Sequence, residues 1–215
     1  RSRETILACA FEEFAAHGYT GGGLNQICIH GGISKGLLYH YYTGKDELFC
    51  ECVRAMFSAM AESLGEYLAG ARSGSANELL SGFFMTRERF FAENHNMRVV
   101  FEDAMLRTPP QLAEEISRLR APVKECNLRL LSSLLKLVRL REGVSERDAM
   151  LWFDAAEGLL PELLSRLTDG SPLSFEAAAH RVFAEVVAAV NEVYLVAASP
   201  DQSDLGRTLD IVAIG

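Results

Sequence analysis

The sequence predicts an all-α protein with an N-terminal three-helix domain and a larger C-terminal helical domain, about nine helices in all. Proline is scarce, with 6 in 215 residues, and the abundant Ala, Leu and Glu favour helix. Apolar residues recur at helical spacing along most of the chain, and short glycine- or proline-rich stretches separate these segments. No segment shows the two-residue alternation of a half-buried strand.

Three short helices are predicted at the N-terminus. The first ends at Gly18, because glycine adopts the left-handed conformation that commonly terminates helices. A second helix follows over 24–30 and ends at Gly31 and Gly32. Ser34 caps the third, over 34–41, since a serine oxygen accepts a hydrogen bond from a free amide of the first turn.

Longer helices follow. One that starts at Asp46 keeps its apolar period for about five turns, until the stretch from Gly70 to Ser75 breaks it. Pro122 and Pro161 fall inside later helices, and each should kink or split its helix. The later helices are expected over 76–93, 97–107, 110–141, 145–168 and 173–197.

The short helices 24–30 and 34–41, joined through a glycine turn, have the layout of a helix-turn-helix. In that motif the second helix lies in the major groove of DNA, and Gly36 would allow close approach there. Lys45 opens the next helix, where its side chain and the free amides could hold a phosphate. The alternative is a small three-helix cap whose polar residues are only solvated.

Residues 6–48 resemble the DNA-binding domain of the TetR family. The resemblance lies in ILACAFEEFAAHGY (6–19) and LNQICIHGGISKGLLYHYYTGKDEL (24–48). It implies an all-helical regulator without a cofactor or catalytic residues. With Gly23 added for its backbone amide, the DNA-facing residues are Gly23, Lys35, Gly36, Leu37, Tyr39, His40, Tyr41 and Lys45. The core positions that it implies are Phe11, Phe14, Ile27, Leu38, Tyr42 and Leu48.

Two departures from the family pattern stand in this stretch. The family usually has Thr or Ser where Gly22 and Gly23 stand, and losing that hydroxyl cap should cost a few tenths of a kcal/mol. The Gly23 amide could replace part of the lost phosphate contact. Cys28 replaces a usual Ala, and it is either a small buried residue or a redox sensor.

The net charge of the chain does not favour DNA binding. The net charge is -8, and residues 1–47 carry four basic against five acidic side chains. Phosphate binding needs local positive charge, so the head is expected to rely on a few well-placed donors. Because the sequence begins at Arg1 rather than Met, we expect residues upstream, where a short basic arm would add affinity.

The C-terminal helices are expected to form an effector pocket and a dimer interface. Ligand pockets combine aromatic and Met side chains with a few polar groups. The effector candidates are Phe57, Met60, Phe84, Phe91, Phe101, Glu102, Met105, Asn127 and Trp152, although most such residues at helical spacing are ordinary core. The dimer candidates on the last two helices are Leu163, Phe183, Val186, Val187, Val190 and Tyr194, with an internal core helix as the alternative.

The predicted organisation is therefore a helix-turn-helix domain over 1–47, an effector and dimerisation domain over 48–198, and a flexible tail over 199–215. The resemblance implies a homodimer that binds palindromic double-stranded DNA and is released by a small, largely apolar effector. In that mechanism the ligand moves the helix joined to the head, and it must prefer the non-binding geometry. A repressor is favoured, although an activator fits the same layout.

Other classes are weakly supported. The sequence has no nucleophile elbow, zinc-protease motif or Walker loop, which argues against an enzyme. Cys50 and Cys52 lie on different sides of a helix, so they cannot chelate a metal together. Five irregularly spaced cysteines and no long apolar run predict a cytoplasmic protein without a membrane span. A helical ligand-binding protein, and a redox-responsive regulator without a small-molecule inducer, remain the alternatives.

Overall fold

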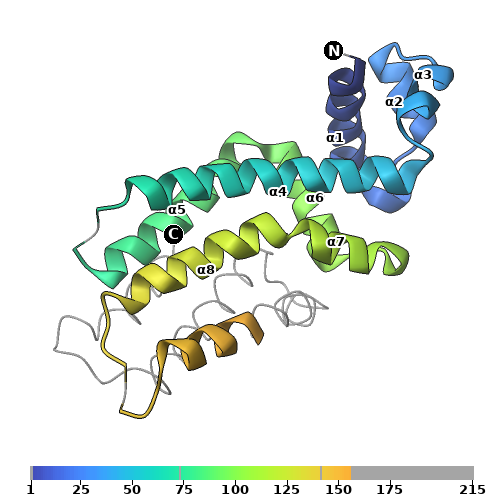
Figure 1. Ribbon diagram of the computed structural model, residues 1–215. Helices are drawn as coiled ribbons and strands as arrows, with labels where there is room; N and C mark the ends of the chain where they lie inside the picture. The colour runs from blue at the N-terminus through green and yellow to red at the C-terminus, as the bar shows by residue number, and fades with distance from the viewer. Residues whose placement is uncertain (1, 73, 141, 156–215) are drawn as a thin grey trace, which may run out of the picture. The chain divides into compact units, whose positions relative to one another are not determined.

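The computed structural model describes residues 2–72, 74–140 and 142–155. Every regular element longer than one residue in these ranges is a helix, which confirms the predicted all-α class (Figure 1). The predicted helix over 173–197, the end of the helix predicted over 145–168, Pro161 and the tail over 199–215 lie outside the described residues.

The three predicted N-terminal helices are present, but the first extends beyond its predicted end at Gly18. They are α1 (Ser2–Gly21), α2 (Leu24–Gly31) and α3 (Lys35–Tyr41). In α1 the regular backbone is interrupted at Gly18, whose φ of 67° and ψ of 175° are not helical, and one more turn follows. The glycine thus breaks the helix as expected but does not end it.

Two long helices and a shorter one follow: α4 (Lys45–Gly70), α5 (Ala76–Glu93) and α6 (His95–Leu106). The start of α4 is fixed by Glu47, whose Oε2 accepts hydrogen bonds from the amide and hydroxyl of Thr43 at 2.7 and 2.8 Å. These bonds hold the pKa of the Glu47 carboxyl below its usual value.

The prediction of one helix over 110–141 is wrong. The segment contains a 3-10 turn, η1 (Pro110–Leu112), then α7 (Ala113–Leu119) and α8 (Ala121–Leu135). Pro122 has no N–H to donate to the preceding turn, so the helix splits just before it, as expected for this proline. Proline is tolerated in the first turn of α8, where amides lack helical partners.

A further helix is described over 146–155. Its first turn carries a capping box, because the Ser145 hydroxyl accepts from the Asp148 amide at 3.2 Å while the Asp148 carboxylate accepts from the Ser145 amide at 3.0 Å. This pair explains why the helix begins at the predicted position.

The chain divides into two compact units, and each is described by itself. The first comprises Arg1–Glu62 and Glu88–Val123, and the second comprises Ser63–Arg87 with the chain from Lys124 onward. The predicted domains span 1–47, 48–198 and 199–215. They remain a prediction, because units defined by contacts need not follow functional boundaries.

The core of the first unit joins the N-terminal helices to α4. The Phe14 ring packs edge-on against Phe49 with centroids 5.2 Å apart, and Tyr19 packs against the same ring at 5.0 Å. The core positions implied by the resemblance are all buried: Phe11, Phe14, Ile27, Leu38, Tyr42 and Leu48. Each large apolar side chain buried there stabilises the fold by about 1.5–3 kcal/mol.

The second unit is held by apolar packing and one close helix contact. The Tyr67 hydroxyl of α4 donates to the Leu79 carbonyl of α5 at 2.9 Å. A side chain at Gly82 would overlap the Tyr67 ring, so the approach of α4 and α5 requires glycine there. Leu131, Leu135 and Ala149 form a smaller apolar cluster.

Candidate nucleic-acid interface

The outer face of α3 carries most of the residues predicted to contact DNA. Tyr39 is 56% exposed and Tyr41 is 39% exposed, whereas Leu38 is fully buried beneath them. The other exposed or half-exposed positions on this helix are Lys35, Gly36, Leu37 and His40. Nothing lies within 4 Å of a side chain built at Gly36, so the backbone of α3 is open to a close partner there.

The turn between α2 and α3 is fixed by glycine and an apolar plug. Gly32 adopts the left-handed conformation with φ of 59°, and the Ile33 amide donates to the Cys28 carbonyl at 2.9 Å. This is the Schellman arrangement that ends helices. The buried Ile33 side chain lies so close to Gly31 that a Cβ there would be 2.4 Å from its Cδ1. The angle between the two helices is therefore fixed by packing as well as by hydrogen bonds.

The N-terminus of α3 is capped as the sequence predicts. The Ser34 hydroxyl accepts a hydrogen bond from the Leu37 amide at 3.1 Å. The N-terminus of α2 is different, because its N-cap is Gly23 in extended conformation and no side chain of the cap bonds the helix.

The Gly23 amide is already engaged in this structure. It donates to Oε1 of the buried Glu13 at 3.0 Å, so its single N–H is not directed at solvent. Its inclusion among the DNA contacts remains a prediction. A side chain has room at Gly23, where the nearest atom to a Cβ is 4.0 Å away, but not at Gly22, where Phe14 Cδ1 is at 2.7 Å.

Lys45 is turned toward the protein. Its Nζ donates to the carbonyls of Thr20 and Gly22, each at 3.3 Å, and lies 4.7 Å from the centroid of the Tyr19 ring. An ammonium has three donors, so one N–H is left for a phosphate. The predicted phosphate contact therefore remains a prediction, and the structure adds a role in tying α4 to the end of α1.

A carboxylate of α6 holds the kink in α1. The buried Asp103 accepts a hydrogen bond from the Tyr19 amide at 2.5 Å and pairs with Arg107 at 2.7 Å. The Tyr19 hydroxyl donates to Asp46 at 2.5 Å and accepts from Gln111 at 2.9 Å. Burial and the neighbouring Asp46 raise the pKa of Tyr19 to about 12. These contacts, here called the α1–α6 joint, link the end of α1 to α4, α6 and η1.

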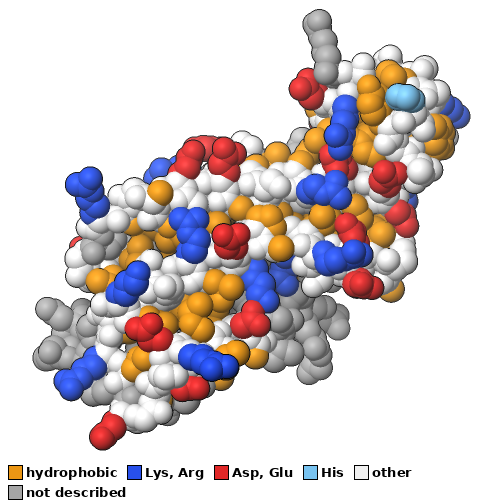
Figure 2. Space-filling view, in the orientation of Figure 1, with side chains coloured by type: hydrophobic (Ala, Val, Ile, Leu, Met, Phe, Trp, Pro, Cys, Tyr) orange, Lys and Arg blue, Asp and Glu red, His pale blue; other side chains and the backbone are white. Residues whose placement is uncertain are grey.

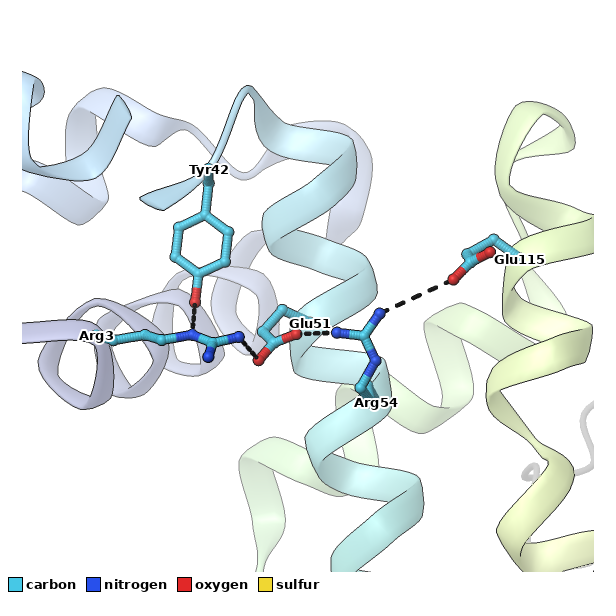
Figure 3. A network of polar contacts seen from close by, with 5 residues as sticks. All are labelled: Arg3, Tyr42, Glu51, Arg54 and Glu115. Atoms are coloured by element: carbon cyan, nitrogen blue, oxygen red, sulfur yellow. Dashed lines mark hydrogen bonds and ion pairs between the residues drawn. The ribbon is translucent and has the colours of Figure 1, made fainter. Parts of the chain in front are cut away.

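A second polar network links the start of α1 to α4 and α7 (Figure 3). Arg3 donates to the Tyr42 hydroxyl at 3.3 Å and to Glu51 at 2.5 Å. Glu51 also pairs with Arg54, whose guanidinium reaches Glu115 at 3.9 Å. Since Tyr42 is the C-cap of α3, the network connects the end of that helix to α4 and α7.

Three of the predicted effector residues lie together in the first unit. Phe101 of α6 packs against Phe57 at 6.0 Å and against Phe91 at 5.0 Å between ring centroids. Glu102 is half-buried and pairs with Arg98 at 3.1 Å, so its carboxylate is partly exposed to water and already has a basic partner. Met60 and Met105 are buried in the same unit.

The remaining effector candidates, Phe84, Asn127 and Trp152, belong to the second unit. Phe84 is buried with the Arg87 guanidinium 4.9 Å from its ring, and the other two are half-buried. The grouping of all nine candidates into one pocket thus remains a prediction. The dimer candidates lie outside the described residues: Leu163, Phe183, Val186, Val187, Val190 and Tyr194.

The cysteines give little support to a redox sensor. All five are free thiols. Burial raises the pKa of the thiols of Cys9, Cys50, Cys52 and Cys126, so less of the reactive thiolate forms. Cys28 is buried, in keeping with a small core residue.

Comparison with known proteins identifies the N-terminal region. Residues 6–52 match the family described as bacterial regulatory proteins, tetR family. This region of the chain is similar to the N-terminal DNA-binding region of that family. The match covers the three N-terminal helices and the start of α4, which contain the α2–α3 turn and the exposed face of α3.

Individual relatives extend this picture. The HTH-type transcriptional regulator LmrA of Bacillus subtilis is 41% identical over 66 residues, which are 30% of this chain and 35% of LmrA. The chain thus covers about a third of the length of the curated relatives it matches.

Solved TetR-like structures share the fold at low identity. SmeT, the repressor of a multidrug efflux pump of Stenotrophomonas maltophilia, has a TM-score of 0.62 at 19% identity, covering 91% of both chains. FadR of Bacillus subtilis in complex with stearoyl-CoA has a TM-score of 0.57 at 17% identity, covering 83% of this chain and 94% of FadR.

Sequence reasoning missed several polar residues that hold the N-terminal helices in place. Asp103 and Gln111 gave no signal, because their partner Tyr19 is far away along the chain. Glu13 did carry a signal, since it lies three residues after Ala10 and seven after Ile6, on the apolar stripe of α1. The exposed Ile29 of α2 was also not singled out.

Two negative findings concern the described part of the chain. No group of three or more His, Cys, Asp or Glu side chains there is placed to hold a metal ion. No helix among those residues is long and apolar enough to cross a bilayer.

Proposed function

We propose that this protein is a ligand-responsive transcriptional repressor that binds a palindromic operator as a homodimer through α3. The main support for the proposal is that α3 has one buried apolar face and one exposed polar face. The apolar side of the helix is fully buried at Leu38, while Tyr39, His40 and Tyr41 are turned outward beside an open backbone at Gly36. A helix presented in this way can enter the major groove.

The predicted contacts divide by chemistry. Lys35 and the remaining N–H of Lys45 would hold phosphates, because an ammonium is a compact donor without sequence preference. Tyr39 and His40 carry hydroxyl and ring-nitrogen groups that can reach phosphates or base edges. The visible face in Figure 2 shows basic and acidic side chains interspersed, in keeping with a head that relies on a few donors.

The proposed effector is small and largely apolar. The aromatic contacts among Phe57, Phe91 and Phe101 in the first unit support this choice, because such rings line most ligand sites. The FadR structure contains stearoyl-CoA, whose acyl chain is apolar and whose CoA part is charged, so it supports only an effector with an apolar portion. The polar candidate Glu102, which follows Phe101 on α6, would orient the ligand.

Release from DNA would pass through α6. Phe101 lies in the aromatic cluster, and Asp103, two residues later on the same helix, holds the Tyr19 amide of α1. A ligand that displaces α6 would therefore disturb the α1–α6 joint. The ligand shifts the population only if it binds the displaced state more tightly than the DNA-binding state.

Dimerisation completes the proposal. Two recognition helices of a dimer read half-sites about 34 Å apart, so a palindrome is expected. The last two predicted helices would form the interface, and the protein would act in the cytoplasm, where its DNA lies.

The experiment is selection of genomic DNA fragments by the purified protein, followed by mobility-shift titration of the enriched fragment. We expect a palindromic sequence, and sizing at micromolar concentration should give about twice the chain mass of 23.7 kDa. The variant Lys35→Ala should weaken the binding of every DNA fragment by a similar factor. The control is Lys136→Ala, because Lys136 is exposed and lies on no predicted contact surface. Failure to enrich any fragment, or a monomer in sizing, would contradict the proposal.

A further inference from the structure

A buried carboxylate lies where α1 meets α2. Glu13 is 3% exposed, although it occupies a helix whose neighbouring positions Glu12 and Ala16 face solvent. Burying a carboxylate is costly unless hydrogen bonds or opposite charges compensate for the lost water. The position is therefore informative, because an apolar residue would fill the same space without that cost.

One carboxylate oxygen of Glu13 caps the start of α2. Its Oε1 accepts from the amide of Gly23, the N-cap of α2, at 3.0 Å. The side chain of a cap residue normally interacts locally with the first turn, but glycine has none. Here the partner comes from α1, so the bond fixes the start of α2 relative to the preceding helix.

The second oxygen of Glu13 is buried without a hydrogen-bond partner, the one such side-chain nitrogen or oxygen among the described residues. The Nδ1 atoms of His17 and His30 lie 3.5 and 4.0 Å from it, within reach of an ion pair. Both imidazoles are more than half exposed, at 53% and 56%, so they can exchange protons with water. The His17 Nδ1 also lies 3.3 Å from the Glu13 carbonyl.

The charges on neighbouring elements are committed to other contacts. On α4, Lys45 is held by the carbonyls of Thr20 and Gly22. On α6, Asp103 faces Gly18 and holds the Tyr19 amide. On α1, Cys9 lies one turn before Glu13, and burial and Glu12 raise the pKa of its thiol. The two imidazoles are therefore the titratable partners of the second oxygen.

We propose that Glu13 is a positioning residue for DNA recognition, which holds the start of α2 through Gly23 and is itself held by His17 and His30. The turn from α2 into α3 is rigid, so a displacement at the start of α2 reaches the DNA-facing helix. This inference rests on the proposed function. It makes DNA affinity depend on the protonation of the two imidazoles.

The direction of the pH effect follows from the charges. A protonated imidazole carries an N–H on each nitrogen, so it donates to the second Glu13 oxygen and offsets the buried negative charge. A neutral ring offers less compensation. The start of α2 is therefore held more firmly when the two imidazoles are protonated, which lower pH favours.

The test is the pH profile of affinity for the selected DNA fragment between pH 8 and pH 6. His40 lies on the DNA-facing helix and is present in every variant, so the variants are compared with wild type. The double variant His17→Asn with His30→Asn keeps a donor near each Nδ1 position but cannot titrate. Wild type should gain up to about fivefold more affinity on acidification than this double variant, the ceiling for partly exposed ion pairs. His95→Asn, an exposed histidine on α6, is the matched control and should leave the profile unchanged.

Substitution of Glu13 separates positioning from packing. Glu13→Gln keeps an acceptor for the Gly23 amide, so affinity at pH 8 should stay within about twofold while the extra pH dependence disappears. Glu13→Leu leaves the amide unpaired, and affinity should fall about tenfold. A wild-type pH profile in Glu13→Gln would overturn the proposal, as would a profile abolished by a chelator, which would indicate a metal ion.

A measurement without DNA distinguishes the role of Glu13 from the proposed DNA-binding function. Hydrogen exchange of the Gly23 amide, corrected for its intrinsic pH dependence, should show more protection at pH 6 than at pH 8 in wild type but not in the double variant. If this holds and no DNA fragment is bound, the proposed function fails while the Glu13 contact stands. If DNA is bound but Gly23 protection and affinity respond to pH alike in all variants, the role of Glu13 is refuted.

Discussion

The outer face of α3 and the α1–α6 joint use polar side chains in opposite ways. On α3, Tyr39 is exposed, and no described residue forms a hydrogen bond or ion pair with its side chain. At the α1–α6 joint, Asp103 and Tyr19 are each held by two internal contacts, and Lys45 is held by two carbonyls near the end of α1. The comparison indicates that one surface is available to a partner, whereas the other sets the orientation of that surface.

The two regions should therefore respond differently to mutation. Removing an exposed side chain changes stability little, while removing a buried acceptor leaves a donor unpaired. Variants of the joint should lower the free energy of unfolding. Variants of α3 should lower DNA affinity without that loss.

The largest effect is expected for Asp103→Ala. The change leaves the Tyr19 amide without its acceptor and removes the partner of Arg107, so the free energy of unfolding should fall by about 2–3 kcal/mol. Urea denaturation measures this value. Arg107→Ala is the control, because that side chain is 60% exposed and its ion pair should contribute less than about 1 kcal/mol. Equal losses in both variants would mean that the ion pair, rather than the amide contact, holds the joint.

A matched pair of glycine variants gives the next effect. Gly22→Ser places a Cβ 2.7 Å from Phe14 Cδ1 and 2.9 Å from the Gly18 carbonyl oxygen, so stability should fall by about 2 kcal/mol. Gly23→Ser has open space and restores a hydroxyl cap to α2, so stability should change by only a few tenths of a kcal/mol, upward. Thermal unfolding of both variants tests the pair. A stable Gly22→Ser protein would show that the head can relax around this contact.

Local signals predicted most of the head. The Ser34 cap, the left-handed Gly32 and the apolar periodicity act within a few residues, so the sequence alone locates α2 and α3. The predicted core residues are buried for the same reason, since helical spacing determines which side faces the neighbouring helices.

The joint could not be predicted in this way. Tyr19 and Asp103 are 84 positions apart, and nothing local to either residue specifies the other. Lys45 was predicted to face phosphate because its position in the chain is right, but its orientation depends on the carbonyls at the end of α1. The split at Pro122 was predicted, because proline has no N–H, but the apolar period over 110–141 gave no sign that α8 ends at Leu135.

The exposed face of α3 is tested by Tyr39→Ala. The Tyr39 side chain is exposed, so stability should change by less than about 0.5 kcal/mol. Affinity for the selected fragment should fall about tenfold, equivalent to about 1.4 kcal/mol. Mobility shift and thermal unfolding, measured on the same preparation, separate the two quantities. Unchanged affinity in a folded protein would remove Tyr39 from the interface, and Tyr39→Phe tests whether the hydroxyl or the ring is needed.

The smallest effect is expected at alkaline pH, from Tyr19 in the joint. Its pKa in the folded protein is raised to about 12 by burial and Asp46, above the ordinary value of 10.0. The folded state therefore holds the phenol proton more tightly than the unfolded state, and the resulting stabilisation is complete below pH 10 and is lost as pH rises from 10 to 12. The difference in unfolding free energy between wild type and Tyr19→Phe should be constant below pH 10 and shrink above it. Tyr39→Phe controls for removal of an exposed phenol from the same head. If the Tyr19→Phe difference kept its size up to pH 12, the hydrogen bonds to Asp46 and Gln111 would not depend on the phenol proton, and the joint would owe its rigidity to Asp103.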